Sequence, residues 1–306
     1  MNPLPIILSR PHGGLSIPVE IQDRLAIDET ALYNDCDLWI DKLFDFDNPD
    51  LEPYVPKPFT KGVLATVSMP IARALIDANR PLSMLGKPDG PVKTQTSYGE
   101  PIYSQPLAED LQEKLIDGYW KIYHQQLEDA LEAHHGNVEL VIDCHNMAQH
   151  GPSAYKDPGS PRPLICIGTL ADKDGNPRPD RGWSFCSREA AFETVALAEK
   201  LFGDMDLLEP NPSGPTPVAA LNQPYAGSYV IMQHLDPDKQ KRNYVDRGVK
   251  PPATIMVEVN RGLFVGDQDA HTVIANPNEE CISAIRQRLY QWAIGLLDIF
   301  NADKDL

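Results

Sequence analysis

The chain has 306 residues, of which 42% are hydrophobic and 23% charged, as expected for a globular protein that buries a sizeable core. Its 27 basic residues stand against 44 acidic ones, and the net charge of −17 makes nucleic acid and anionic membranes unfavourable partners. An anionic substrate would therefore need a specific local arginine.

Strands and helices are expected to alternate along the chain. Short apolar runs predict strands at 5–9, 62–68, 72–77, 138–143, 164–169 and 254–260. Apolar residues at helical spacing predict helices at 29–46, 106–135, 187–203 and 278–300. This alternation predicts an α/β three-layer sandwich with a mixed, mostly parallel sheet. No linker demands a split, so we expect one domain over 1–306.

Two proline-rich stretches, 81–106 and 151–180, interrupt this pattern. They are too long to be simple connectors, and loops of that length in a compact domain are usually functional or mobile. We expect both to be active-site loops.

Three predicted strands end at groups that can bind a metal or transfer a proton: His12, His145 and Glu258. Active sites of open α/β sheets gather at the carboxyl ends of the strands, so this convergence predicts a site. Each residue alone also has a simpler interpretation. Either histidine could be a hydrogen-bonded structural residue. Glu258 could form an ion pair with Arg261 or another arginine, because a buried carboxylate needs a partner.

Two imidazoles and one carboxylate suit zinc, which takes three protein ligands in hydrolases and keeps a position open for water. His12 and His145 supply the imidazoles, and either Asp35 or Asp37 could supply the carboxylate. The segment that holds both aspartates could instead be a solvated acidic turn at a helix start. Glu258 is then the candidate that moves the proton of the attacking water.

The segment 71–81 places Arg73 and Arg80 around an apolar stretch, with Asp77 and Asn79 beside them. In an acidic protein, arginines near a catalytic pocket are natural partners of a substrate carboxylate or an oxyanion. Asp77 could equally serve only as an ion-pair partner of Arg80.

Cys144 and His145 are neighbours on predicted extended backbone, so their side chains point to opposite faces and do not form a nucleophile–base pair. We interpret Cys144 as a small packing residue and Asp143 as a support for its neighbourhood. The five cysteines form no Cys-x-x-Cys pair, which predicts reduced thiols. No apolar run would span a bilayer and no signal peptide is evident, so we expect a cytoplasmic protein.

Phosphate-binding, serine-hydrolase, HExxH and dinucleotide motifs are absent. The order of the remaining motifs resembles the N-formylglutamate amidohydrolase (N-formylglutamate deformylase) family. The similar segments run in order from about residue 7 to 265 and read RPHGG, DCDLWIDKLFDF, RALIDANRP, GEPIY, YHQQLE, IDCHNM, ICIGT and MVEVNRGLF.

This resemblance implies a zinc-carboxypeptidase-like (phosphorylase/hydrolase-like) fold and the hydrolysis of N-formyl-L-glutamate to formate and glutamate, late in histidine degradation. Carried onto matching positions, it implies a Zn2+ ion bound by His12, Asp37 and His145, with Glu258 as the catalytic carboxylate. Asp37 is the more family-like of the two aspartates.

Two positions depart from the family pattern. The family continues a glycine-rich segment as Gly-Gly-His-x-Thr-Arg, whereas this chain has Tyr225 and Gly227 with no Thr-Arg after them. Asn146 stands where the family has serine. If the missing arginine reads a substrate carboxylate in the family, this chain must read it differently or accept another substrate.

We therefore expect a zinc-dependent amidohydrolase that acts on a small N-acyl amino acid. Glu258 and Arg73 are the expected catalytic residues, and the expected substrate-binding residues are Arg80, Asn79 and Tyr225. A zinc exopeptidase or another acyl-amino-acid hydrolase is the alternative enzyme, and an inactive binding protein on the same scaffold is the alternative class. The sequence does not indicate an oligomeric partner.

Overall fold

A single six-stranded sheet organises the computed structural model, which describes residues 2–212 and 214–303. Within these residues the strand order is β2-β1-β3-β6-β4-β5. The neighbours from β2 to β6 run parallel, whereas β4 runs antiparallel to β6 and parallel to β5. The strands are β1 (Leu4–Arg10), β2 (Val63–Ser68), β3 (Leu140–Met147), β4 (Ile165–Gly168), β5 (Ala219–Leu221) and β6 (Ala253–Asn260). The predicted mixed, mostly parallel sheet is confirmed.

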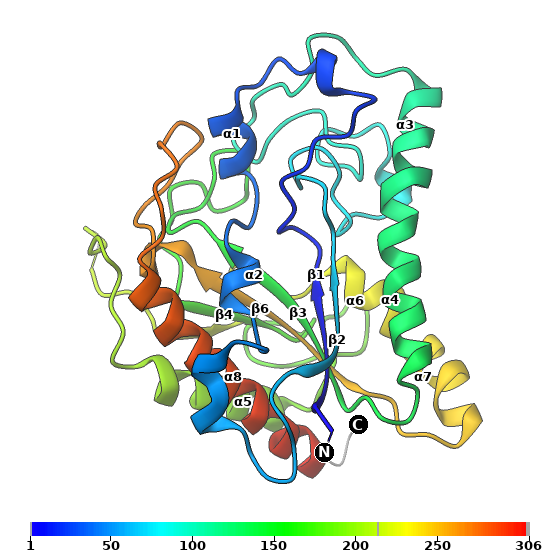
Figure 1. Ribbon diagram of the computed structural model, residues 1–306, viewed down its shortest axis with the longest axis vertical. Helices are drawn as coiled ribbons and strands as arrows, with labels where there is room; N and C mark the ends of the chain where they lie inside the picture. Colours follow the sequence, from blue (N-terminus) through cyan, green and yellow to red (C-terminus); the bar gives the residue numbers. More distant parts are fainter. Residues whose placement is uncertain (1, 213, 304–306) are drawn as a thin grey trace.

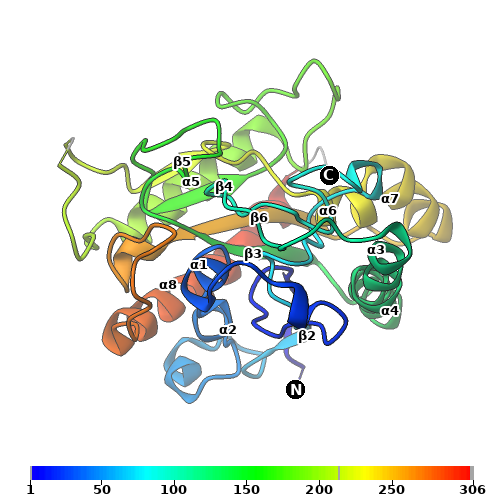
Figure 2. The ribbon, with the colours of Figure 1, turned by 90° about the horizontal axis from the view of Figure 1, so that it is seen from above.

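Helices cover both faces of this sheet, which completes three layers (Figure 1, Figure 2). One face packs against α2 (Ile40–Leu43), α5 (Arg188–Phe202) and α8 (Glu279–Ala302). The elements on the other side are α1 (Glu29–Asn34), α3 (Glu109–Leu115), α4 (Lys121–Ala133), α6 (Tyr229–Leu235) and α7 (Pro237–Asn243). Short 3-10 turns lie at Gln22–Arg24, Pro49–Tyr54, Leu82–Met84, Val245–Arg247 and Arg261–Leu263, and a π turn at Ile116–Trp120 joins α3 to α4.

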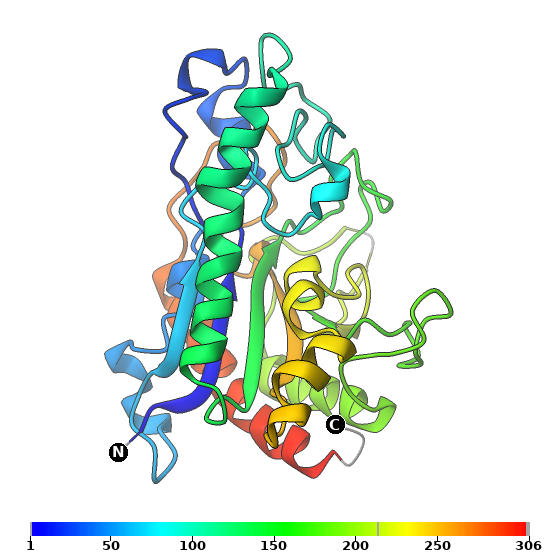
Figure 3. The same ribbon diagram turned by 90° about the vertical axis from the view of Figure 1, so that its right-hand side faces the viewer.

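The alternation of side chains along each strand divides the core into two parts and positions the site. Ile142 and Cys144 point into the core beneath α5 and α8, while Val141 points into the core on the α4 side. Asp143 and His145 share the parity of Val141, so both face the α4 side. Figure 3 shows α4 lying along the strands, with the long loops gathered above the upper end of the sheet.

Two predicted elements differ from the structure. The helix predicted over 29–46 is broken between α1 and α2, where Trp39 adopts a left-handed φ of 61°. The strand predicted over 72–77 is a turn, because Leu75 and Ile76 both donate backbone hydrogen bonds to Ala72. The prediction also missed α6, α7 and the short strand β5.

Two long segments follow their predictions, each with an interruption. The helix predicted over 106–135 is continuous but contains the π turn, and the 151–180 stretch is divided by β4. In the described part of the chain, no helix is both long enough and apolar enough to cross a membrane.

Candidate metal centre and active site

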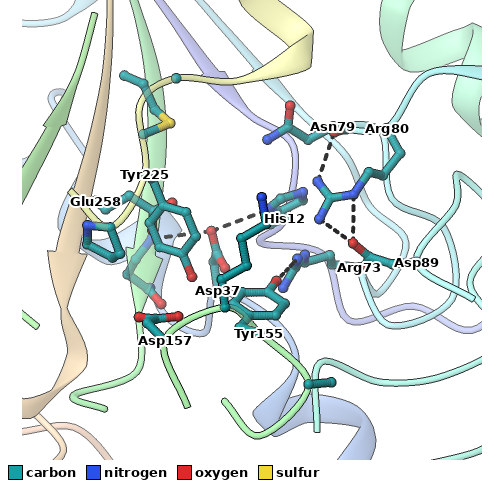
Figure 4. A pocket seen from close by; sticks show the side chains of 16 residues that line it. His12, Asp37, Arg73, Asn79, Arg80, Asp89, Tyr155, Asp157, Tyr225 and Glu258 are labelled. Carbon is teal, nitrogen blue, oxygen red and sulfur yellow. Dashed lines mark hydrogen bonds and ion pairs between the residues drawn. The ribbon is translucent and has the colours of Figure 1, made fainter. Parts of the chain in front are cut away.

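The predicted site residues converge at the carboxyl ends of β1, β3 and β6, at a cavity of about 370 Å³ (Figure 4). His12 follows β1 by two residues. The prediction placed His145 just beyond the end of a strand. It lies within β3 instead, because the strand continues to Met147. It stands in register with Glu258 on the neighbouring parallel strand β6, so the two side chains lie on the same face of the sheet.

Three buried side chains form a cluster that could hold a metal ion: His12, Asp37 and His145. The Nδ1 atoms of the two histidines are 3.1 Å apart. Asp37 Oδ2 lies 3.1 Å from His145 Nδ1 and 3.6 Å from His12 Nδ1. All three residues are at most 5% exposed, so water does not screen the electrostatic interactions among them.

Each histidine is held from behind by a second buried carboxylate. Asp77 Oδ1 lies 2.8 Å from His12 Nε2, and Asp143 Oδ2 lies 2.9 Å from His145 Nε2. An ionised carboxylate only accepts, so each Nε2–H donates outward and each Nδ1 lone pair turns toward the other ring. Two facing lone pairs need a cation between them, either a proton or a metal ion.

The pKa values in the cluster express this demand for positive charge. Burial alone would lower the pKa of His145, but the charge of Asp143 and hydrogen bonds to Asp143 and Asp37 raise it well above its usual range. Burial would likewise raise the pKa of Asp37, yet the hydrogen bonds of His12 and His145 hold it well below its usual range. In the absence of a metal, a proton takes the place of the cation.

The donor set and its spacing fit zinc. Tetrahedral zinc with bonds of about 2.0–2.1 Å to nitrogen and oxygen places its ligand atoms roughly 3.3 Å apart. The separations among His12, Asp37 and His145 are 3.1, 3.1 and 3.6 Å. Carboxylates behind both histidines are the usual support of metal-binding imidazoles.

The structure brings Asp37, not Asp35, to the two histidines. Asp35 Oδ2 accepts a hydrogen bond of 2.9 Å from Lys93, and both side chains are almost fully buried. Asp35 Oδ1 also accepts from the backbone N–H of Ser97. Burial would raise the pKa of Asp35, but Lys93 and Arg73 outweigh it and lower that pKa. Asp35 is therefore an ion-pair partner.

Backbone contacts explain why His12 and Asp37 meet although they lie on separate loops. The Asp37 N–H donates to the His12 carbonyl, and the Asn146 N–H donates to Asp37 Oδ2. Gly14 lets the first loop lie directly on the backbone of 69–70, since a Cβ there would collide with two carbonyl groups. The acidic segment is thus a built part of the site rather than a solvated turn.

Glu258 lies next to the cluster with no hydrogen-bond partner among the described residues, although it is only 8% exposed. Desolvation raises its pKa to about 8, with a further contribution from the charge of Asp37. The alternative ion pair with Arg261 does not form, because Arg261 donates to the carbonyl groups of Asn34 and Cys36 instead. A buried carboxyl group that faces a cavity with a raised pKa is typical of catalytic sites.

Arg73 and Arg80 line the cavity on the other side of His12 from Glu258 (Figure 4). Arg73 donates through Nε to Asp77 and through Nη2 to the hydroxyl of Tyr155. Arg80 donates through Nε and Nη2 to Asp89, and it lies 3.8 Å from Asp77. The predicted Asp77–Arg80 pair therefore exists, but Asp77 lies closer to His12, at 2.8 Å.

Asn79 and Tyr225 also line the cavity, and different contacts hold their side chains. The side-chain oxygen of Asn79 accepts from the backbone N–H groups of Tyr229 and Val230 at the start of α6, which leaves its Nδ2 toward the cavity. Tyr225 stands over the site beside Tyr155, and the guanidinium of Arg162 lies 5.0 Å from its ring centre. Both residues remain predictions as substrate contacts.

Sequence reasoning missed the residues that the 151–163 loop brings to the cavity. Tyr155 and Lys156 line it directly, and Asp157 forms an ion pair with Arg162. The available signal was the proline-rich composition of this loop, which predicted a functional segment but not which side chains enter the site.

Cys144 takes no part in the site. Its side chain lies in the opposite core, and burial followed by the charge of Asp143 raises the pKa of its thiol well above the usual value. A thiol held in that form is not a nucleophile. The packing role predicted for Cys144 agrees with this position.

Comparisons with known proteins agree with these features. A family model described as N-formylglutamate amidohydrolase matches residues 4–264. The N-formylglutamate deformylase of Pseudomonas putida is 29% identical over 161 residues, which are 50% of this chain and 55% of that protein. The match thus spans about half the length of the curated relative.

Two solved structures share the fold. The N-formylglutamate amidohydrolase of Ralstonia eutropha has a TM-score of 0.60 at 19% identity, with 96% of each chain covered. A gene product of Agrobacterium tumefaciens has a TM-score of 0.54 at 14% identity, with 97% of this chain and 89% of that one covered. With the family match over most of its length, the chain belongs to the N-formylglutamate amidohydrolase family.

Proposed function

We propose that this protein is a zinc-dependent amidohydrolase that removes the formyl group of a small N-formyl amino acid, with N-formyl-L-glutamate as the substrate. The observation that carries the proposal is the buried His12–Asp37–His145 cluster beside an unpartnered Glu258. The family match and the name of the Pseudomonas relative support the choice of bond and substrate.

Zinc bound at the cluster supplies Lewis-acid chemistry, which polarises a carbonyl group and lowers the pKa of water. Glu258 takes the proton of the attacking water and delivers it to the leaving nitrogen. Its raised pKa suits that double role, because the group must both accept and release a proton near neutral pH. The protein excludes bulk water, since the reacting end of the cavity is built from buried residues.

The guanidinium groups bind negative charge. Arg73 is linked to the cluster by its hydrogen bond to Asp77. It stabilises the charge that develops on the acyl oxygen. Arg80 binds a substrate carboxylate, and Asn79 and Tyr225 orient the substrate between the two ends. Because Arg80 is already held by the half-exposed Asp89, the substrate must exchange with that carboxylate. The loops over 81–106 and 151–180 act as the walls of the site within one domain.

The cellular setting follows from the same proposal. Removal of formate from N-formylglutamate belongs late in histidine degradation, a cytoplasmic pathway. All five cysteines are free, and four of them are buried, which suits a reducing compartment.

A formate-release assay on the zinc-loaded protein tests the proposal. N-formyl-L-glutamate should be hydrolysed faster than N-formyl-L-glutamine, which has nearly the same shape without the side-chain charge. Arg80→Met should remove this preference while it leaves the glutamine substrate little affected. Release of formate from none of the N-formyl amino acids would overturn the proposed activity, and a preference for the glutamine substrate would overturn the role of Arg80.

A further inference from the structure

Tyr123 connects helix α4 to the candidate metal centre through a buried hydrogen-bond chain. Its hydroxyl lies 2.7 Å from Ser9 Oγ, and Ser9 Oγ lies 2.5 Å from Asp143 Oδ1. The other oxygen of Asp143 lies 2.9 Å from His145 Nε2. None of these four residues is more than 1% exposed, so the chain is isolated from solvent.

The protons in this chain can be placed from the acceptors alone. Ser9 donates to one oxygen of Asp143, and His145 Nε2 lies within hydrogen-bond distance of the other oxygen. The single hydroxyl proton of Ser9 is therefore donated to Asp143. Ser9 Oγ in turn accepts a hydrogen bond from the Tyr123 hydroxyl. All donors point toward Asp143, which is the arrangement that strengthens each bond in turn.

The shape of the helix places Tyr123 at this point. The π turn at Ile116–Trp120 inserts an extra residue before α4 and so rotates everything that follows relative to α3. As a result Tyr123 faces the sheet, while its neighbour Ile122 is 49% exposed. Trp120, about one turn before Tyr123, and His124, the residue after it, donate to the carbonyl groups of Arg80 and Ala78. The same helix thus contacts both sides of the site.

We propose that Tyr123 is a positioning residue for the metal centre: through Ser9 it fixes the orientation of Asp143, and thereby the ring of His145. Asp143 held in this way keeps the proton of His145 on Nε2 and leaves the Nδ1 lone pair directed at His12 and Asp37. The inference rests on the proposed metal site but assigns residues, Tyr123 and Ser9, that do not touch metal or substrate.

The first test compares the zinc dissociation constants of Tyr123→Phe and the unmodified protein by competition with a chelator. Loss of an outer hydrogen bond commonly weakens metal binding about 10-fold to 100-fold. Tyr123 acts through two further groups, so we expect about a fivefold loss, with kcat reduced and KM unchanged. Tyr103→Phe is the matched control, because the buried Tyr103 hydroxyl has no hydrogen-bond partner among the residues that the structure describes. This variant should leave zinc binding unchanged.

A double-mutant cycle separates positioning from general loosening of the core. Ser9→Ala should weaken zinc binding at least as much as Tyr123→Phe, and adding Tyr123→Phe to Ser9→Ala should have no further effect. Equal effects of Tyr123→Phe in both backgrounds, or unchanged zinc binding in the single variant, would overturn the inference. Failure of the unmodified protein to bind zinc is a different result, which would overturn the proposed function itself.

Discussion

Two pairs of histidines lie in contact in this molecule, and their surroundings differ. His12 and His145 approach with Nδ1 atoms 3.1 Å apart, and their rings are inclined by 64°. His124 and His234 stack with an interplanar angle of 21°, and His124 Nδ1 lies 2.8 Å from His234 Nε2. Both pairs are buried, so burial alone does not distinguish a structural pair from a metal centre.

The two pairs differ in the group that accepts a hydrogen bond from their outward-facing Nε2–H. His124 Nε2 donates to the carbonyl of Ala78, so its Nδ1 accepts the Nε2–H of His234 and both rings stay neutral. Burial lowers the pKa of His124 to about 4 and that of His234 to about 3. In the other pair each outward Nε2–H meets a carboxylate, and both inward lone pairs compete for one cation. A neutral acceptor therefore leaves a packing element, and charged acceptors leave a cluster that could hold a metal ion.

The largest expected contrast between the pairs is in metal binding. His145→Ala should remove stoichiometric zinc and lower turnover by at least about 10³-fold. His234→Gln, which keeps a donor for His124, should retain both. Metal analysis of the purified variants and the formate assay provide the measurement. Zinc retained at full occupancy in His145→Ala would place the ion elsewhere.

A smaller loss, in turnover only, is expected at Glu258. Glu258→Gln keeps the size of the side chain but cannot take a proton, so kcat should fall by about 10²-fold to 10⁴-fold. Zinc content should not change, because Glu258 is outside the cluster. Retained turnover in this variant would remove Glu258 from proton transfer.

The third contrast is in the pH dependence of stability. The pKa values of His124 and His234 are lower in the folded state than the unfolded value of 6.5, so the unfolded chain binds more protons between pH 6.5 and about 4. Stability is therefore complete above pH 6.5 and falls as the pH decreases through this window, by roughly 3 kcal/mol per histidine. The facing charges, Lys239 and Asp143, oppose each other.

Urea unfolding at several pH values measures this effect. The free energy of unfolding of a His124→Gln, His234→Gln double variant should depend less on pH over the same window. Parallel curves for the two proteins would show that this pair does not titrate on unfolding.

The smallest expected effect is the stabilisation of the fold by zinc. At a free zinc concentration of about 100 times the dissociation constant, the folded state should gain about 2.7 kcal/mol. Thermal unfolding of the metal-free protein should show an increase in Tm on zinc addition, and His12→Asn should show little. An equal increase in both proteins would indicate zinc binding outside the cluster.

The sequence predicted most strands of the sheet, though not β5, and its candidate ligands for a clear reason. Buried parallel strands are continuous apolar runs, so a histidine or glutamate at the end of such a run is conspicuous. His145 and Glu258 stood out in this way. The family resemblance then indicated which of these residues to expect as ligands, and it favoured Asp37 over Asp35.

Contacts between distant residues could not be predicted. The choice between Asp35 and Asp37 depends on Lys93, which lies 58 residues along the chain from Asp35. The link between Tyr123 and Ser9 spans 114 residues, and it also requires a π turn that leaves no periodic signal. The segment 72–77 was predicted as a strand because it is an apolar run. Its apolar residues are buried by tertiary packing in a turn, not within a sheet.

Anomalous scattering at the zinc absorption edge, from crystals of the zinc-loaded protein, locates the ion. We predict one strong peak within bonding distance of Nδ1 of His12, Nδ1 of His145 and a carboxylate oxygen of Asp37. A peak at another position, or Nε2 atoms directed at the ion in place of Nδ1, would contradict this prediction.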